Sequence, residues 1–248
     1  MDWTKAKNII IAALLITNLI LIGSLVGKHL YNEEIQRVEI ADTISVMESR
    51  NIYFEAKLPE KPGNHPILYV EYDTIDPEKI NESIANQAGL GSNEITEASI
   101  KQYVVDFLKS ASIYSKNLML QSISNKDGVY YLEYKNMVGK FPLEDSYIKC
   151  SVKNGKIENF HRVWLKPLEF GKNKRAVMDV SSALVRFMNA LQKEQANGEK
   201  ITITKMELVY WLDTSAFDLN SPISDTAFPS WKITYNNGKV MHILGYEI

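Results

Sequence analysis

Cysteine is almost missing from this chain of 248 residues, and Cys150 is the only one. An intrachain disulfide is therefore excluded, and any folded domain must be held together by its apolar core. Apolar residues make up 45 % of the sequence and charged residues 23 %, close to the averages of globular proteins. A chain of this length and composition can bury a core large enough to fold without disulfides.

The sequence also lacks the motifs of common enzyme classes and any excess of positive charge. No G-x-S-x-G elbow, P-loop or dinucleotide fingerprint occurs, and the four histidines do not have metal-ligand spacing. The net charge of −2 provides no electrostatic attraction for nucleic acid. We therefore predict a protein that is not an enzyme, that holds no cofactor or metal, and that has no nucleic-acid partner.

The side chains that could take part in catalysis or ligand binding have simpler interpretations. Cys150 is more typical of buried filler than of a nucleophile. His161 and His242 each follow a predicted turn and are expected to be strand residues rather than a ligand pair. Four carboxylates are of the residue type that catalyses hydrolysis. They fall in predicted polar loops, however, where solvated acids are expected: Glu144, Asp145, Asp213 and Asp218. Three tryptophans are expected to pack in the core or between modules, with a peptide or glycan groove as the alternative: Trp164, Trp211 and Trp231.

One long apolar run stands at the start of the chain. Ile9 to Val26 contains no charged residue and, as a helix, would be about 27 Å long, which matches the hydrocarbon core of a bilayer. A signal peptide is the rival interpretation, but its apolar region is shorter and ends in an A-x-A-like site, which Ile22-Gly23-Ser24 resembles poorly. We predict a cytoplasmic head over residues 1–8 and a single transmembrane helix over residues 9–27. The large C-terminal region is then extracytoplasmic in the cell membrane.

Small and polar residues give this helix two different faces. At 100° per residue, Ala12, Gly23 and Gly27 fall within about 60° of one another, and Thr17 extends this stripe. Gly23 and Gly27 form a G-x-x-x-G pair, which lets another helix approach closely. Asn18 lies on the opposite side, near the membrane centre. These five residues are the predicted partner-binding positions, although small residues are also common in membrane helices without a partner.

The rest of the chain has mixed helix and strand patterns and predicts an α+β fold. Residues 28–50 favour a juxtamembrane helix, and residues 51–58 and 67–72 favour strands. Helices are predicted from Asp76 to about Gln87 and from Thr96 to Ser110, with Asp76 and Thr96 as N-caps. A further helix over Val180 to Ala196 has one apolar face: Val180, Leu184, Phe187, Met188 and Leu191.

A repeat organises the C-terminal part. The segments 147–157 and 230–240 share Lys and Asn-Gly-Lys at matching positions, and each predicts a hairpin with a type I′ turn, at Asn154-Gly155 and at Asn237-Gly238. Each copy has the order helix, strand, long loop, hairpin. We therefore predict two packed modules built from antiparallel sheet plus helices, over residues 51–165 and 166–248.

The opening MDWTKAKNIIIAALLITNLIL is similar to the start of the YycI (WalI) family of Gram-positive bacteria. The C-terminal pattern Val209-Tyr-Trp211, Pro229-Ser-Trp-Lys-Ile233 and Gly238 resembles the closing module shared by YycI and its companion YycH, which is related to PepSY-like modules. The resemblance implies a non-catalytic accessory protein of the WalK/WalR (YycG/YycF) two-component system. It also implies two partners, a YycH-like protein and the WalK (YycG) sensor histidine kinase, contacted chiefly through membrane helices.

Two classes of function follow from the sequence. The first is a membrane regulator of a cell-wall-sensing kinase. The second is a tethered extracytoplasmic module that binds cell-wall glycan or a wall hydrolase, with the N-terminal helix as a passive anchor.

Overall fold

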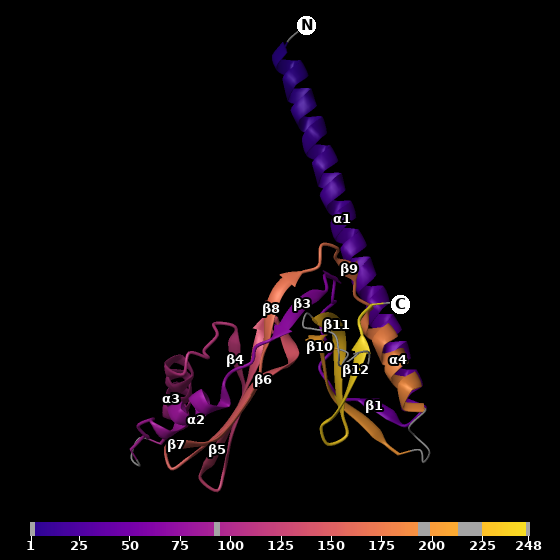
Figure 1. The fold of residues 1–248 in the computed structure, drawn as a ribbon. Helices are drawn as coiled ribbons and strands as arrows, with labels where there is room; N and C mark the ends of the chain where they lie inside the picture. Colours follow the sequence, from indigo (N-terminus) through magenta and orange to yellow (C-terminus); the bar gives the residue numbers. More distant parts are fainter. Residues whose placement is uncertain (1–2, 92–94, 193–198, 213–224, 247–248) are drawn as a thin grey trace. The chain divides into compact units, whose positions relative to one another are not determined.

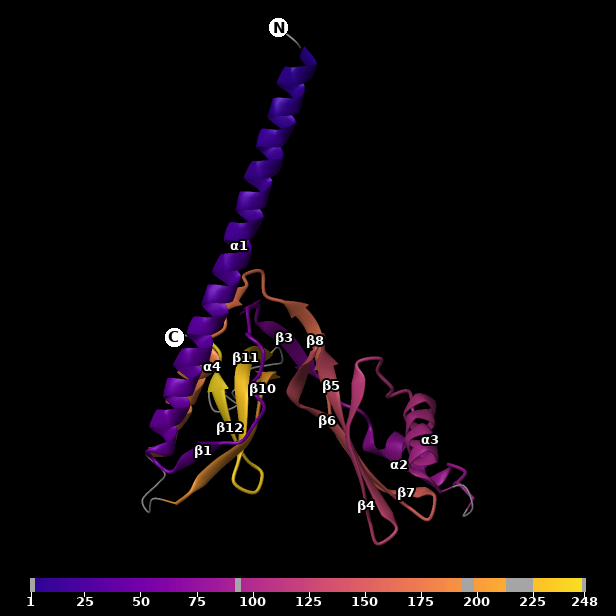
Figure 2. The same cartoon turned by 180° about the vertical axis from the view of Figure 1, so that it is seen from behind.

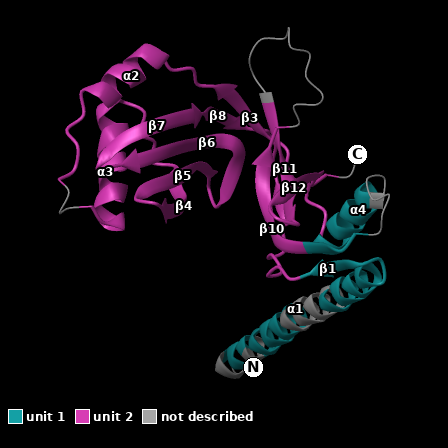
Figure 3. Cartoon of the chain, turned by 90° about the horizontal axis from the view of Figure 1, so that it is seen from below, with its two compact units in different colours: residues 1–54, 180–202 teal, residues 55–179, 203–248 magenta. Residues whose placement is uncertain are grey.

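A computed structural model describes residues 3–91, 95–192, 199–212 and 225–246. For residues 4–6, 9–10, 12, 26–36, 192 and 225 the description covers the backbone alone. The chain divides into two compact units, which Figure 3 distinguishes by colour. Unit 1 consists of residues 1–54 and 180–202, and unit 2 of residues 55–179 and 203–248. The predicted module boundary at residue 165 stays a prediction.

In its described residues, unit 1 contains the helices α1 and α4, the short strand β1 and the first two residues of β10. Helix α1 (Trp3–Glu48) is unbroken through both the predicted transmembrane segment and the predicted juxtamembrane segment. Strand β1 (Ile52–Phe54) follows a tight turn, and helix α4 (Val180–Gln192) packs against α1. The predicted apolar face of α4 is confirmed, since all of its members are buried: Val180, Leu184, Phe187, Met188 and Leu191.

The two helices of unit 2 begin where the sequence predicts. In α2 (Pro77–Ala85), the Asp76 side chain accepts a hydrogen bond from the Glu78 backbone N–H at 3.0 Å. In α3 (Glu97–Ser110), Thr96 and Ser99 form a reciprocal capping box. These caps satisfy backbone N–H groups that lack a partner within the helix, so both predicted starts are confirmed.

Strands form most of unit 2, and the sheet is largely antiparallel (Figures 1 and 2). Its hydrogen-bonded order is β4-β5-β6-β10-β11-β3-β8, with β7 paired to β6 and β12 paired to β11. A separate pair joins β2 to β9. The bounds are β2 (Asn64–His65), β3 (Leu68–Tyr72), β4 (Leu118–Lys126), β5 (Val129–Val138), β6 (Phe141–Lys153), β7 (Lys156–Val163), β8 (Leu165–Phe170), β9 (Arg175–Ala176), β10 (Ile201–Trp211), β11 (Asp225–Tyr235) and β12 (Lys239–Leu244).

Strand β6 changes partner along its length. Near its start, Leu143 is paired in parallel with Tyr210 of β10. Further along, Tyr147 to Lys153 pair antiparallel with β7. Strand β5 pairs with β6 on its other side. One long strand therefore belongs both to the β4–β7 part of the sheet and to the part formed by β10, β11 and β12.

Among the described residues of unit 2, buried apolar side chains form the following core clusters. The first lies between the helices α2 and α3 and one face of β4–β7, with fully buried members that include Ile100, Val104, Leu108, Ile148 and Val152. The second joins β3, β6, β8 and β10: Leu68, Val70, Leu143, Leu165, Tyr210 and Leu212. Because α2 and α3 cover only one face of β4–β7, the opposite face is available for polar side chains.

The first predicted hairpin turn is confirmed, and the second differs. Asn154 and Gly155 both have positive φ (49° and 73°) between the paired residues Lys153 and Lys156, as a type I′ turn requires. At the second hairpin, Tyr235 pairs with Lys239, which leaves a loop of three residues, Asn236-Asn237-Gly238, all with positive φ. The expected two-residue turn is wrong there, because Asn236 also tolerates the left-handed conformation and joins the loop.

The predicted long loop of the first copy is also wrong. Strand β5 continues to Val138, and a turn at Gly139 (φ 62°) leads directly into β6 at Phe141. Pro142 lies near the start of β6, where proline is tolerated. The mixed α+β class with a large antiparallel sheet is confirmed, while a copy-by-copy match of the two repeats stays a prediction.

Candidate functional site

The five predicted partner-binding residues all belong to α1. Thr17 is exposed, and its hydroxyl donates a hydrogen bond to the Ala13 carbonyl oxygen at 2.9 Å, which satisfies it within the helix. Asn18 is exposed, and no atom would lie within 4 Å of a Cβ added to Gly23. The side chain of Ala12 and the surroundings of Gly27 lie outside the described residues.

Helix α1 exposes apolar side chains over several turns. Those between residues 11 and 25 are 45–69 % exposed: Ile11, Leu14, Leu15, Ile16, Leu19, Ile20, Leu21, Ile22 and Leu25. Contiguous exposed apolar surface of this kind marks a site of contact with lipid or with another protein. Within the described residues, no helix meets the length and hydropathy required to cross a bilayer.

A cluster of charged side chains is buried in unit 2. The Lys232 Nζ of β11 lies 2.5 Å from the Glu144 Oε1 of β6, and the Lys135 Nζ of β5 lies 3.7 Å from the same oxygen. Lys135 also donates a hydrogen bond to the Glu144 backbone oxygen at 2.8 Å. The four side chains of Lys135, Glu144, Lys232 and His242 are only 10–17 % exposed, and we call them, with Asp145, the charge cluster.

Burial sets the protonation states inside the charge cluster. It lowers the pKa of His242 to about 4, against the partly offsetting effect of Glu144, so this imidazole is neutral at physiological pH. Burial also lowers the pKa of Lys135, with Glu144 opposing the shift. The pKa of Asp145 is raised by burial and by the neighbouring charge of Glu144. The His242 ring stacks on Trp211, with centroids 4.7 Å apart and planes at 8°.

The sequence-based placement of the carboxylates is wrong for the two that the structure describes. Glu144 and Asp145 lie within strand β6 rather than in a solvated loop. Asp213 and Asp218 lie outside the described residues. The cluster joins β5 and β6 to β11 and β12, which are far apart in sequence. Removing one partner of a buried ion pair of this kind leaves an uncompensated buried charge. In β5, Tyr131, Glu133 and Lys135 occupy every second position. This spacing in the sequence predicts that the side chains of Glu133 and Lys135 lie on the same face of the strand.

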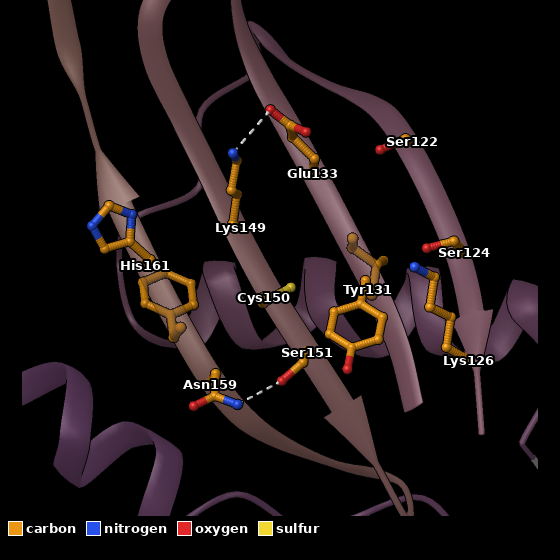
Figure 4. A pocket seen from close by; sticks show the side chains of 12 residues that line it. Ser122, Ser124, Lys126, Tyr131, Glu133, Lys149, Cys150, Ser151, Asn159 and His161 are labelled. Atoms are coloured by element: carbon orange, nitrogen blue, oxygen red, sulfur yellow. Dashed lines mark hydrogen bonds and ion pairs between the residues drawn. The ribbon is translucent and has the colours of Figure 1, made fainter. Parts of the chain in front are cut away.

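The uncovered face of β4–β7 carries a second set of polar side chains around a cavity of about 710 Å³. Cross-strand pairing arranges them in two rows that run across the four strands (Figure 4). The first row is Ser122, Glu133, Lys149 and His161, and the second row is Ser124, Tyr131, Ser151 and Asn159. We call these eight side chains, with Lys126, the open face.

The remaining candidates of the sequence analysis lie in strands or in the core. Cys150 is 5 % exposed in β6, where burial raises its pKa to about 12 and makes it a poor nucleophile. His161 and His242 lie in β7 and β12, as predicted. Trp231 is fully buried, and its Nε1–H donates to the Met178 carbonyl oxygen at 3.0 Å. Trp164 is 7 % exposed, although it borders a second cavity of about 450 Å³.

The described side chains of these sites are of types that suit binding and ion pairing. Among the described residues, no group of three or more His, Cys, Asp or Glu side chains could hold a metal ion. The charge cluster places two acids beside two lysines, since Lys135 and Lys232 both pair with Glu144 and both interact with Asp145. The open face presents hydroxyl, amide, imidazole and phenol groups without a buried nucleophile–base pair.

Comparison with known proteins gives a family match and weak structural likeness to solved structures. No curated protein matches the chain. Among solved structures, the chain is similar to the Bacillus megaterium YpeB C-terminal domain, with a TM-score of 0.31 and 12 % identity over 63 % of this chain and 69 % of that one. The family model described as YycI protein matches residues 32–244. Since this match covers most of the chain, the protein belongs to the YycI family.

Proposed function

We propose that this protein is a non-catalytic, membrane-anchored regulator of the WalK (YycG) histidine kinase, acting together with a YycH-like companion. Family membership supports a regulatory role in the WalK/WalR system. The exposed apolar surface of α1 carries the more specific part of the proposal, because those side chains need a partner or lipid to leave water. In this proposal residues 9–27 span the cell membrane, residues 1–8 are cytoplasmic, and two YycH/PepSY-like modules lie outside.

Within unit 1, helix α1 offers a direct route between the membrane and α4. Its 46 residues form one helix of about 69 Å without a break. Its C-terminal end is anchored in unit 1, where Met47 is fully buried and α1 packs on α4. A rotation or tilt of the apolar part would therefore be passed on to unit 1, since a continuous helix transmits such motions better than a flexible linker.

Regulation through α1 requires that it bind two states of the kinase unequally. A helix with equal affinity for both states would shift nothing, however tightly it bound. The two faces of α1, with Gly23 on one and Asn18 on the other, provide the chemical asymmetry for such a preference. An experiment that replaces the apolar part of α1 tests whether this preference exists.

The test replaces Met1 to Lys28 with an unrelated transmembrane helix. Autophosphorylation of WalK is measured in liposomes with the companion and either the parent chain or the swapped chain. We expect the swap to abolish the modulation while thermal unfolding of unit 2 is unchanged. The variant Leu21→Ile, which keeps volume and apolarity, serves as the control and should modulate normally. Full modulation by the swapped chain would contradict the proposal and favour the passive anchor.

A tethered binding module is the second candidate function. The open face favours it, since this surface has a cavity of about 710 Å³ and polar groups arranged in register. The two functions are compatible, because one resides in α1 and the other in unit 2.

A further inference from the structure

The polar side chains of the open face are arranged more regularly than those of an ordinary solvated sheet surface. Each row contains one side chain from each of β4, β5, β6 and β7, so hydrogen-bonding groups repeat at the spacing of the strands. Ser151 is only 4 % exposed, and its hydroxyl accepts a hydrogen bond from the Asn159 amide at 3.0 Å. Tyr131 is 48 % exposed and lies between Ser124 and Ser151 in the second row. Figure 4 shows these side chains together on the side of the sheet away from the helix.

The composition of the open face limits the class of ligand. Strands β5 and β6 are paired on both sides, so a peptide cannot add itself as a further strand at this position. A helical peptide needs a broad apolar groove, whereas the two rows contain hydroxyl, amide and charged groups with one exposed tyrosine. Nucleic acid needs a strongly positive surface, and Glu133 neutralises Lys149 at 3.8 Å. One aromatic ring flanked by hydroxyl and amide groups suits a sugar ring, which has both apolar C–H faces and hydroxyl groups.

The positive charge of Lys126 indicates one further feature of the ligand. Lys126, at the end of β4, borders the same cavity. In the part of the chain that the structure describes, Lys126 has no ion-pair partner, whereas Lys149 pairs with Glu133. A carboxylate on the ligand would supply the missing negative charge.

We propose that the open face binds a short linear oligosaccharide that carries a carboxylate group. Tyr131 stacks against one sugar ring, and Ser124 and Asn159 exchange hydrogen bonds with hydroxyl groups on the same ring and the next. The buried Ser151 holds the Asn159 amide in position through its hydrogen bond. Lys126 binds the carboxylate. This inference does not depend on kinase regulation by α1, so either can fail without the other.

Binding is measured by ligand-observed NMR with the full chain in a detergent that has no sugar head group. The probes are a hyaluronan tetrasaccharide, which alternates acidic and neutral sugars, and a neutral tetramer of N-acetylglucosamine. We expect the acidic probe to bind several-fold more tightly. Tyr131→Ala should weaken both probes about tenfold, in line with the loss of one stacked ring, while Tyr131→Phe should retain most of the affinity. Lys126→Gln should remove the preference for the acidic probe and leave the neutral probe unaffected.

Two controls make the result decisive. Tyr114→Ala removes a tyrosine of similar exposure, 45 %, away from the open face and should change nothing. An oligoglutamate peptide tests whether Lys126 merely attracts any anion. The proposal is overturned if neither sugar binds, if Tyr114→Ala weakens binding as much as Tyr131→Ala, or if the peptide binds as tightly as the acidic sugar and ignores Tyr131→Ala.

Discussion

Helix α1 exposes apolar side chains, which are usually buried, whereas the sheet of unit 2 buries charged side chains, which are usually exposed. In α1, apolar side chains from Ile11 to Leu25 are about half exposed or more, whereas in unit 2 the charged side chains of Lys135, Glu144 and Lys232 are largely buried. Exposed large apolar surface and buried charge are the two informative exceptions to the rule that apolar residues lie inside.

The two exceptions have different consequences. The charge cluster has its opposite charges within the chain, because Lys135 and Lys232 lie close to Glu144 and interact with Asp145. The apolar surface of α1 between residues 11 and 25 has no such compensation within the described residues. This contrast indicates a structural role for the charges of unit 2 and supports the external partner, lipid or protein, that we propose for α1. Three measurements separate these roles.

The largest effect is expected from Glu144→Gln. This variant keeps the shape of the side chain but leaves Lys135 and Lys232 buried without the counter-charge of Glu144. Breaking a buried pair in this way costs about 3–5 kcal/mol of the free energy of unfolding. Urea denaturation of the full chain in detergent, followed by tryptophan fluorescence, measures the change.

The control for this prediction is Glu60→Gln. Glu60 also faces a lysine, Lys140, at 3.3 Å, but both side chains are well exposed. Exposed pairs contribute little, so no measurable change is expected. If the two variants changed the free energy of unfolding equally, burial of the charge cluster would have no energetic consequence. The structural role of these charges, which distinguishes unit 2 from α1, would then be contradicted.

A smaller effect is expected from pH. The folded state lowers the pKa of His242 from 6.5 to about 4. As pH falls through this window, the unfolded chain takes up a proton that the folded chain does not, so stability decreases. Between pH 7 and pH 5 the loss is about 2 kcal/mol from this group. The raised pKa of Asp145 acts in the opposite direction over acidic pH, because there the folded state binds its proton first.

Comparison with His242→Phe isolates the contribution of the imidazole. Phenylalanine keeps an aromatic ring to stack on Trp211 but cannot titrate. Urea midpoints at both pH values, for the parent chain and this variant, give the difference. The variant should lose less stability on acidification than the parent. An identical pH dependence of the two proteins would contradict the assignment of a neutral, buried His242.

The sequence predicts the local elements of this fold better than their long-range contacts. The caps at Asp76 and Thr96 and the Asn154-Gly155 turn are determined by a few adjacent residues, and the structure contains all three. Glu144 was misplaced because its partners, Lys135 and Lys232, are brought to it by strand pairing, and Lys232 is 88 residues away. The open face was missed for the same reason, since its rows depend on register across four strands.

The smallest effect is expected in the apolar part of α1. Interhelical hydrogen bonds are worth about 0.6 to 2 kcal/mol, and close backbone packing adds a comparable amount, which shifts a population several-fold without an all-or-none switch. We predict one partner helix for each face, with the companion on one and the kinase on the other. Asn18→Leu should then weaken one partner, and Gly23→Leu or Gly27→Leu should weaken the other. Crosslinking in membranes of each variant against each partner measures this, with Leu21→Ile as the neutral control. If all three leucine variants lose the same partner to the same extent, α1 has a single contact face, and if none loses a partner, lipid alone covers its apolar surface.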